Sequence, residues 1–200
     1  MNPAGARSLT LGDLALPRAG WQSNACLIAG ASVATALAAQ IEFRLPWTPV
    51  PITGQTFAVL LSGAVLGPRR AFAAQLLYLA EGAAGLPVFA GGAFGAARFA
   101  GPAGGYLLAF PFAAAVTGAL AERGWDRRFF TMLVAMLLGS AVIFAGGLSG
   151  LARFVPLDEL LGSGFLPFLP GDLIKSTLSA LAFPAAWRIA GRAQREERSS

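Results

Sequence analysis

Histidine is absent from this sequence, and cysteine occurs once, as Cys26. A lone cysteine excludes an internal disulfide, and we interpret Cys26 as a packing residue within an apolar run. Because the common zinc sites in proteins are built from histidine and cysteine clusters, the sequence predicts no such metal site. It contains no signal for a bound cofactor either.

Charged residues are scarce as well. They make up 12% of the chain, about half of what a soluble domain carries, whereas hydrophobic residues make up 56%. The mean hydropathy of +0.62 is that of a chain surrounded by lipid. The formal net charge of +5 does not indicate nucleic acid, because the arginines are scattered between apolar segments. The composition therefore predicts an integral membrane protein.

Six apolar segments could each cross the hydrocarbon core of a bilayer, namely 23–43, 53–67, 71–84, 106–121, 129–151 and 171–190. Prolines and glycines separate them, and proline in particular stops a helix. We predict an all-α membrane protein, a six-transmembrane-helix bundle over residues 23–190 with tails at 1–22 and 191–200. The first 20 residues lack a continuous apolar stretch, so we expect no signal peptide.

The positive charges predict an orientation. Six spans place both tails and two of the connections on one side of the membrane, and eleven arginines fall there. The opposite side holds only four cations: Arg44, Arg98, Arg153 and Lys175. Because lysine and arginine accumulate in cytoplasmic loops, we predict that both termini are cytoplasmic. The connections rich in proline and glycine then face outward.

Residues 88–105 are apolar but rich in glycine, which disfavours a helix by about 1 kcal/mol per residue relative to alanine. Irregular backbone at membrane depth is tolerated only where it is buried in protein or lines a cavity. The segment therefore indicates irregular outer loops that wall a ligand pocket. A plain surface loop is the other interpretation.

Residues 170–175 (PGDLIK) carry the most informative polar signal. A proline and a glycine open a helix there, so Asp172 and Lys175, the only lysine of the chain, lie in its first turns and on one face. Charged groups inside a membrane are energetically expensive and are commonly functional. We predict that both side chains contact a polar ligand, and an internal salt bridge is the alternative.

Four further residues could bind the same ligand. Arg98 could hold a carboxylate in a bidentate contact, or it could lie in water at the membrane surface. Thr53 and Gln55 follow the proline-rich loop, where they could line a pocket or form hydrogen bonds between helices. Trp47 within that loop could be a lid or an anchor at the membrane interface.

Three enzyme classes are excluded by missing groups. Residues 147–150 (GLSG) are similar to the serine motif of rhomboid proteases, but the chain has no histidine to act as the base. An intramembrane aspartyl protease would need a second central aspartate beside Asp172. A phosphate-binding loop is absent because isoleucine, not glycine, precedes Lys175, so this chain cannot hydrolyse ATP. We predict a protein that is not an enzyme.

Four blocks of the sequence resemble the BioY family, the biotin-specific S components of energy-coupling-factor transporters. They are 46–56 (PWTPVPITGQT), 85–92 (GLPVFAGG), 101–108 (GPAGGYLL) and 170–175 (PGDLIK). The resemblance spans about 23–190 and implies a six-helix substrate-binding protein whose outer pocket is closed by extracellular loops. It implies that Asp172 and Lys175 are ligand contacts. We add Gly91 and Tyr106, which lie within the blocks, to the predicted binding residues.

At Ala103 the family commonly has threonine, so any hydroxyl contact at this position is lost. The resemblance implies high-affinity biotin binding and uptake across the cytoplasmic (inner) membrane of a bacterium. A transmembrane coupling (T) subunit and a pair of ATP-binding subunits would supply the energy. Small residues of the first span, such as Ala34 and Ala38, would face the coupling subunit. An S component or a solitary carrier for another small vitamin is the alternative.

Overall fold

The structure, a computed structural model, describes residues 9–15 and 20–199, and the side chains of 9–14 and 20–190. The predicted tails fall partly outside the described residues. The helices are α1 Leu11–Ala15, α2 Trp21–Ala39, α3 Gln55–Leu66, α4 Pro68–Ala83, α5 Gly104–Ala121, α6 Phe129–Leu151, α7 Leu160–Gly164 and α8 Leu169–Ser199. The strands are β1 Glu42–Phe43 and β2 Ile52–Thr53, and the 3-10 turns are η1 Ala90–Gly92, η2 Ala96–Ala100 and η3 Trp125–Arg127.

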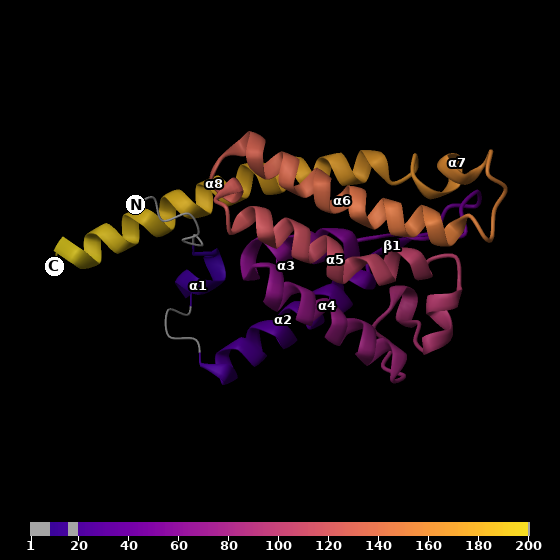
Figure 1. Cartoon of the computed structure of the whole chain (residues 1–200), viewed down its shortest axis with the longest axis horizontal. Coiled ribbons are helices and arrows are strands. Elements are labelled where there is room, and N and C mark those ends of the chain that lie inside the picture. Colours follow the sequence, from indigo (N-terminus) through magenta and orange to yellow (C-terminus); the bar gives the residue numbers. More distant parts are fainter. Residues whose placement is uncertain (1–8, 16–19, 200) are drawn as a thin grey trace, which may run out of the picture.

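The predicted six-helix bundle is confirmed, with α2, α3, α4, α5, α6 and α8 in the six predicted spans (Figure 1). Within the described part of the chain, α2, α5 and α6 are long and apolar enough to cross a membrane by themselves, and α3 is a shorter apolar helix. Their outer faces carry large exposed apolar side chains, as expected of helices in lipid. Examples are Val33, Leu37, Val134 and Leu138.

Two helix ends differ from the prediction. The first span was predicted to continue to Phe43, but α2 ends at Ala39, because the chain turns into β1 and pairs with β2. The last helix was predicted to end near residue 190, but it continues to Ser199 through a segment of good helix formers. At about 1.5 Å per residue it is about 46 Å long, more than the hydrocarbon core requires.

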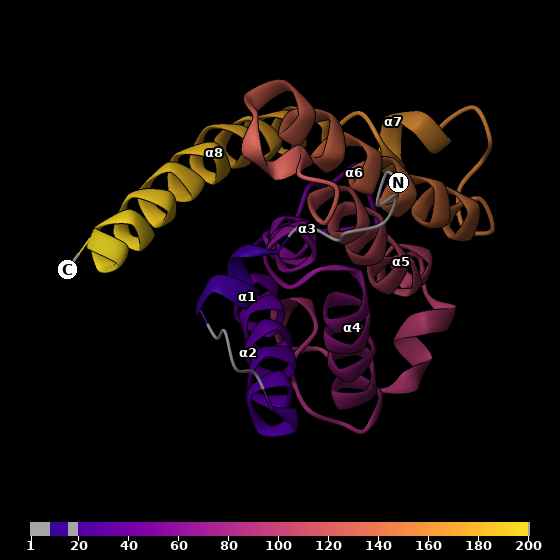
Figure 2. The same ribbon diagram turned by 60° about the vertical axis from the view of Figure 1, so that its left-hand side comes forward.

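Helix α5 is the centre of the bundle and packs against α3, α4 and α6, while α2 covers α4, and α8 covers α6 (Figure 2). Glycines allow the close approach of α5 and α6. A Cβ atom added to Gly105 would lie 2.2 Å from the carbonyl oxygen of Gly146, so only glycine fits there. The largest fully buried side chains lie around α5: Leu60, Tyr78, Phe110, Met132, Met136, Ile143 and Leu151.

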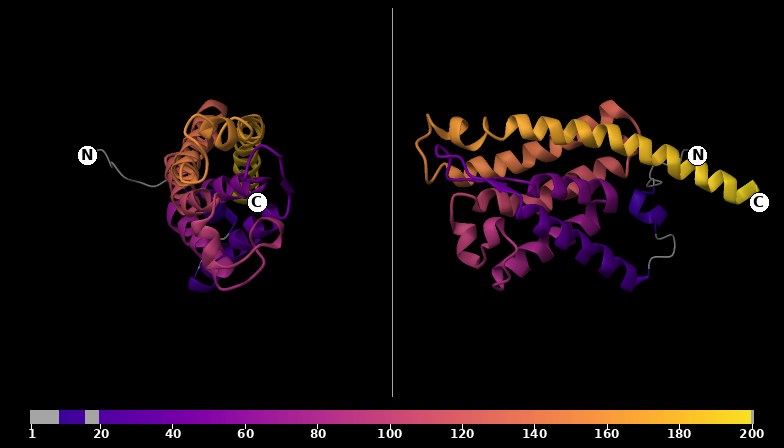
Figure 3. Two further views of the ribbon diagram at one scale, coloured as in Figure 1. Left: turned by 90° about the vertical axis from the view of Figure 1, so that its right-hand side faces the viewer. Right: turned by 180° about the vertical axis from the view of Figure 1, so that it is seen from behind.

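The irregular segments gather at one end of the bundle. Helix α1 and the C-terminal part of α8 lie at one end, and β1 and α7 lie at the other (Figures 1 and 3). At the β1 end, β1 and β2 form a two-stranded antiparallel hairpin around the proline-rich loop 44–51. The glycine-rich segment 88–105 contains two 3-10 turns and three glycines with positive φ, and it is not a transmembrane helix, as predicted.

Candidate functional site

A cavity of about 400 Å³ lies at this irregular end, in the size range of small-molecule sites. The proline-rich loop, the segment 89–103 and helices α3, α5, α6 and α8 all contribute to its wall. The glycine-rich segment thus lines a cavity and is not a plain surface loop. Side chains with polar or charged groups at the wall are Arg44, Thr48, Thr53, Gln55, Thr56, Arg98, Tyr106, Asp172 and Lys175.

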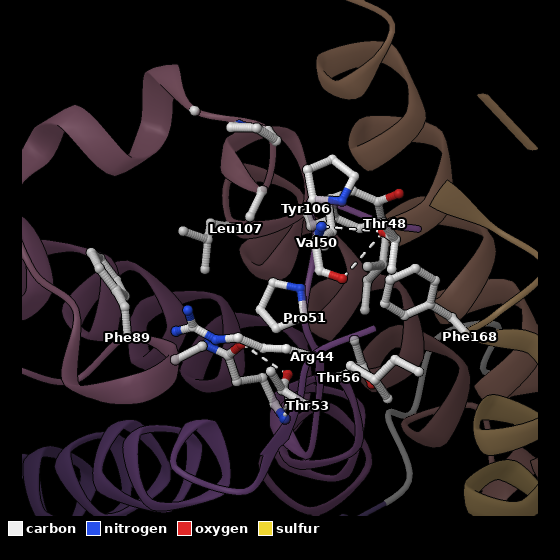
Figure 4. A pocket seen from close by; sticks show the side chains of 18 of the residues that line it. Arg44, Thr48, Val50, Pro51, Thr53, Thr56, Phe89, Tyr106, Leu107 and Phe168 are labelled. Atoms are coloured by element: carbon white, nitrogen blue, oxygen red, sulfur yellow. Dashed lines mark hydrogen bonds between the residues drawn. The ribbon is translucent and has the colours of Figure 1, made fainter. Parts of the chain in front are cut away.

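Most of the remaining wall is apolar and aromatic. Figure 4 shows Pro51 between Phe89 and Phe168, with Tyr106 and Leu107 above it. The rings of Tyr106 and Phe168 are 6.1 Å apart between centroids, so α5 and the residue directly before α8 meet through an aromatic contact. The lining therefore suits a compact, largely apolar molecule with a few polar groups.

Asp172 and Lys175 lie in the first two turns of α8, on the face that lines the cavity. Asp172 is 7% exposed and accepts a hydrogen bond of 2.7 Å from the hydroxyl of Ser140 on α6. The Lys175 ammonium donates to the carbonyl oxygen of Thr53 at 2.9 Å and to the hydroxyl of Thr56 at 3.4 Å. Helix α8 is thereby tied to both α6 and the base of the hairpin.

The internal salt bridge that the sequence allowed is not formed. Among the described side chains, Asp172 and Lys175 make no ion pair with each other or with another charged group. A carboxylate can accept several hydrogen bonds and an ammonium can donate three, so both groups keep unused capacity on the side of the cavity. Buried charges of this kind are costly unless a partner compensates them.

The ionisable groups of the wall carry an excess of positive charge: Arg44, Arg98 and Lys175 against Asp172. Arg44 forms an ion pair of 3.1 Å with Glu42, but its side chain is 73% exposed, so the pair contributes little to stability. Arg98 is also exposed. The cavity can therefore take an anionic ligand at its rim and a hydrogen-bond donor at Asp172.

Six of the eight predicted binding residues line the cavity, namely Thr53, Gln55, Arg98, Tyr106, Asp172 and Lys175. Gly91 and Trp47 are not part of the lining. Trp47 is 64% exposed on the hairpin loop. Gly91 has a φ of +64°, and a Cβ atom there would lie 2.7 Å from the Glu42 carboxylate, so this glycine leaves room for the Glu42–Arg44 pair.

Gln55 lines the cavity and also joins helices. Its amide donates to the hydroxyl of Tyr78 on α4, and its carbonyl oxygen accepts from the hydroxyl of Thr53 at 2.9 Å. The Tyr78 hydroxyl in turn donates to the carbonyl oxygen of Val88 at 3.1 Å. This chain of hydrogen bonds fixes the hairpin base and the glycine-rich segment relative to each other, so both roles predicted for Gln55 apply.

Several lining or supporting residues were not among the predicted site residues. Ser140 donates a hydrogen bond to Asp172. It is a polar residue in the middle of an apolar span, and this unusual position could have predicted a role in the site. We used Arg44 only to predict the orientation in the membrane, although it directly follows the first predicted span. Phe144 and Phe168 gave no signal, because the chain contains fifteen phenylalanines spread over its length.

Comparisons with known proteins point to one family. The family description that matches residues 14–192 is that of the BioY family. A probable biotin transporter BioY of Pyrococcus horikoshii is 41% identical over 147 residues, which cover 74% of this chain and 85% of the relative. The biotin transporter BioY of Rhizobium etli is 39% identical over 159 residues, covering 76% and 85%.

A solved structure has the same fold. It is the crystal structure of the S-component for biotin from an ECF-type ABC transporter, and it matches with a TM-score of 0.75 and 27% sequence identity. The match covers 84% of this chain and 92% of that one.

Proposed function

The chain belongs to the BioY family, and we propose on this premise that it is the high-affinity biotin-binding membrane subunit of an energy-coupling-factor (ECF) transporter. It binds biotin and mediates its uptake, while a transmembrane coupling subunit and a pair of ATP-binding subunits supply the energy. It has no enzymatic activity of its own. The observation that carries the proposal is the cavity whose largely apolar wall holds an acid and a base, each hydrogen-bonded to neutral groups and without an ion pair among the described side chains.

Biotin matches the chemistry of this cavity. Its fused bicycle is apolar apart from a ureido edge, which presents both N–H donors and a carbonyl acceptor. Asp172 and Lys175, one helical turn apart, offer the complementary acceptor and donor. The valerate carboxylate of biotin then lies at the rim, where the guanidinium groups of Arg98 and Arg44 are exposed.

The charge distribution supports an outward-facing cavity. Of the described arginines, Arg69 and Arg70 begin α4 beside α1, Arg123 follows α5, and Arg127, Arg128 and Arg188 line one groove, whereas Arg44 and Arg98 line the cavity and Arg153 follows α6. By the positive-inside rule both termini are cytoplasmic and the cavity opens outward. We place the protein in the cytoplasmic membrane of a bacterium.

Calorimetry with a panel of vitamins tests the cargo. We expect biotin to bind the purified protein tightly, and thiamine and riboflavin to give no heat of binding, because neither carries a carboxylate for the cationic rim. Desthiobiotin, which keeps the ureido ring and the carboxylate, should bind more weakly than biotin. Heat from thiamine or riboflavin without heat from biotin would show that the protein serves another vitamin.

Helix α2 offers a surface for the coupling subunit. Ala25 and Ala29 are exposed on one face of α2 and Ala34 is exposed on the opposite face, and small exposed side chains of this kind allow a second helix to approach closely. Ala38 is half-buried instead, and its Cβ atom would contact a Cβ atom placed on Gly54 at 3.4 Å. We therefore propose that Ala34 contacts the coupling subunit, with Ala38 at the inner margin of that surface.

Replacing Ala34 by tryptophan tests this surface. Because a tryptophan would keep a partner helix away, we expect biotin uptake by the assembled transporter to fall at least tenfold, with biotin binding by the isolated subunit unchanged. Ala141→Trp, at an alanine of α6 that is also exposed, is the matched control and should keep uptake. Normal assembly and uptake with Ala34→Trp would place the coupling subunit on a different face.

A further inference from the structure

A basic groove lies at the end of the bundle opposite the cavity. It is formed by η3, the first turn of α6 and the middle of α8 (180–188), which pack against one another. Three arginines line it together with apolar side chains, and its lining includes Arg127, Arg128, Phe129, Leu181, Trp187 and Arg188. The first residue of α6 is among them, so the positive end of that helix dipole also faces the groove.

Two of the guanidinium groups are held in place without losing their charge. Arg127 lies over the ring of Trp187, 4.5 Å from its centroid. The Trp187 ring is fixed in turn, because its N–H donates at 2.6 Å to the fully buried carboxylate of Asp126. The Nε atom of Arg188 donates to the carbonyl oxygen of Pro184 at 3.3 Å.

The groove therefore has unbalanced positive charge. None of its three arginines forms an ion pair with any side chain that the structure describes. Among the described side chains, Asp126 interacts electrostatically with Arg127, but it is buried behind Trp187 and offsets at most one of the three charges. Preoriented cations without a carboxylate partner are complementary to an anion, and a phosphate group accepts from several guanidinium groups at once.

The surface next to the groove is apolar and faces lipid. Phe130 is 78% exposed on α6, and Leu181 and Leu178 are more than half exposed on α8. Trp187 and the arginines mark the level at which lipid headgroups lie. A ligand in this groove thus meets cations at one end and a lipid-facing apolar surface at the other.

From this arrangement we propose that the groove binds the headgroup of an anionic phospholipid, whose acyl chains follow the exposed faces of α6 and α8. A soluble anion would use only the arginines, whereas a phospholipid uses the charged and the apolar parts together. The bound lipid would hold η3 and α8 together at the membrane surface.

Native mass spectrometry of the full chain, mixed with equal amounts of phosphatidylglycerol and phosphatidylcholine, tests the proposal. We expect retained phosphatidylglycerol to exceed phosphatidylcholine by about tenfold. In the variant Arg127→Gln/Arg128→Gln/Arg188→Gln the ratio should fall to about one. The matched control Arg69→Gln/Arg123→Gln/Arg153→Gln removes three exposed arginines that lie outside the groove, and it should keep the preference.

Three results would overturn the proposal. Equal retention of both lipids by the wild-type protein would show that the groove does not select an anionic headgroup. An equal loss of preference in the control variant would show that diffuse charge attracts the lipid. Displacement of phosphatidylglycerol by millimolar inorganic phosphate would identify a site for a free anion. The first and third results need only the wild-type chain, so they test the proposed lipid site even if the groove variant folds poorly.

Discussion

Replacement of Lys175 by alanine is expected to lower the affinity for biotin about a hundredfold, which corresponds to about 2.7 kcal/mol. The ammonium lies at the wall of the cavity and uses its donors only on Thr53 and Thr56 among the described residues, so it can still donate to a ligand. A hydrogen bond to a charged group contributes about 1.5–3 kcal/mol, and its loss leaves the polar edge of the ligand unpaired. Calorimetry measures the change.

The variant Asp172→Asn distinguishes a role of this carboxylate in biotin binding from a role in the stability of the fold. Asparagine keeps the shape of the side chain but removes the charge, so we expect the affinity to fall about tenfold. The melting temperature of the ligand-free protein should stay the same or rise, because a buried carboxylate with a single hydrogen bond from Ser140 loses the energetic cost of its desolvation. A structural salt bridge would give the opposite pattern, with lower stability and unchanged affinity.

Matched controls exist at the same end of the molecule. Asp158→Asn and Arg153→Ala each remove one exposed charge that does not line the cavity. Both variants should bind biotin as the wild-type protein does. If they lose as much affinity as the Asp172 and Lys175 variants, the general charge of this end matters, and direct contact is not the cause.

Gly105→Val is expected to have the largest effect on stability. A Cβ atom at this position would lie 2.2 Å from the carbonyl oxygen of Gly146 and 3.0 Å from the Cα atom of Gly150. Both neighbours are backbone atoms of α6, so the helices themselves must move apart. Overpacking of this kind costs about 3 kcal/mol, and the melting temperature should fall clearly.

The same substitution should weaken biotin binding. Helices α5 and α6 both contribute to the cavity wall, for example with Tyr106 and Phe144, and their separation distorts it. Gly30→Val is the matched control, since no atom lies within 4 Å of a Cβ atom at that position of α2. Wild-type stability and affinity in Gly105→Val would show that α5 and α6 do not pack as described.

The sequence predicts the helical scaffold well, because lipid imposes strong rules on it. A chain in a bilayer must satisfy its backbone hydrogen bonds within helices, so long apolar runs and the prolines between them locate the spans. The same rules constrain the ends of the helices and the connections between them less strongly. The hairpin that replaces the end of the first span depends on pairing between residues eleven and nine positions apart, namely Glu42↔Thr53 and Phe43↔Ile52.

The polar part of the site is predicted better than its apolar wall. Asp172 and Lys175 stand out because a charge in a membrane helix is rare and needs a reason. The aromatic wall is formed by residues from distant segments, such as Phe89 and Phe168, and only the packing of the helices brings them together. Trp47 and Gly91 lie close to the lining residues in sequence, yet the path of the loops places them outside the lining.

The most direct test of the central claim is an experimental structure of the protein with biotin bound. We predict that biotin lies in the cavity between the hairpin and α8, with its ureido edge within hydrogen-bond distance of Asp172 and Lys175. Biotin bound elsewhere, or bound in the cavity while both side chains contact only protein groups, would contradict the account.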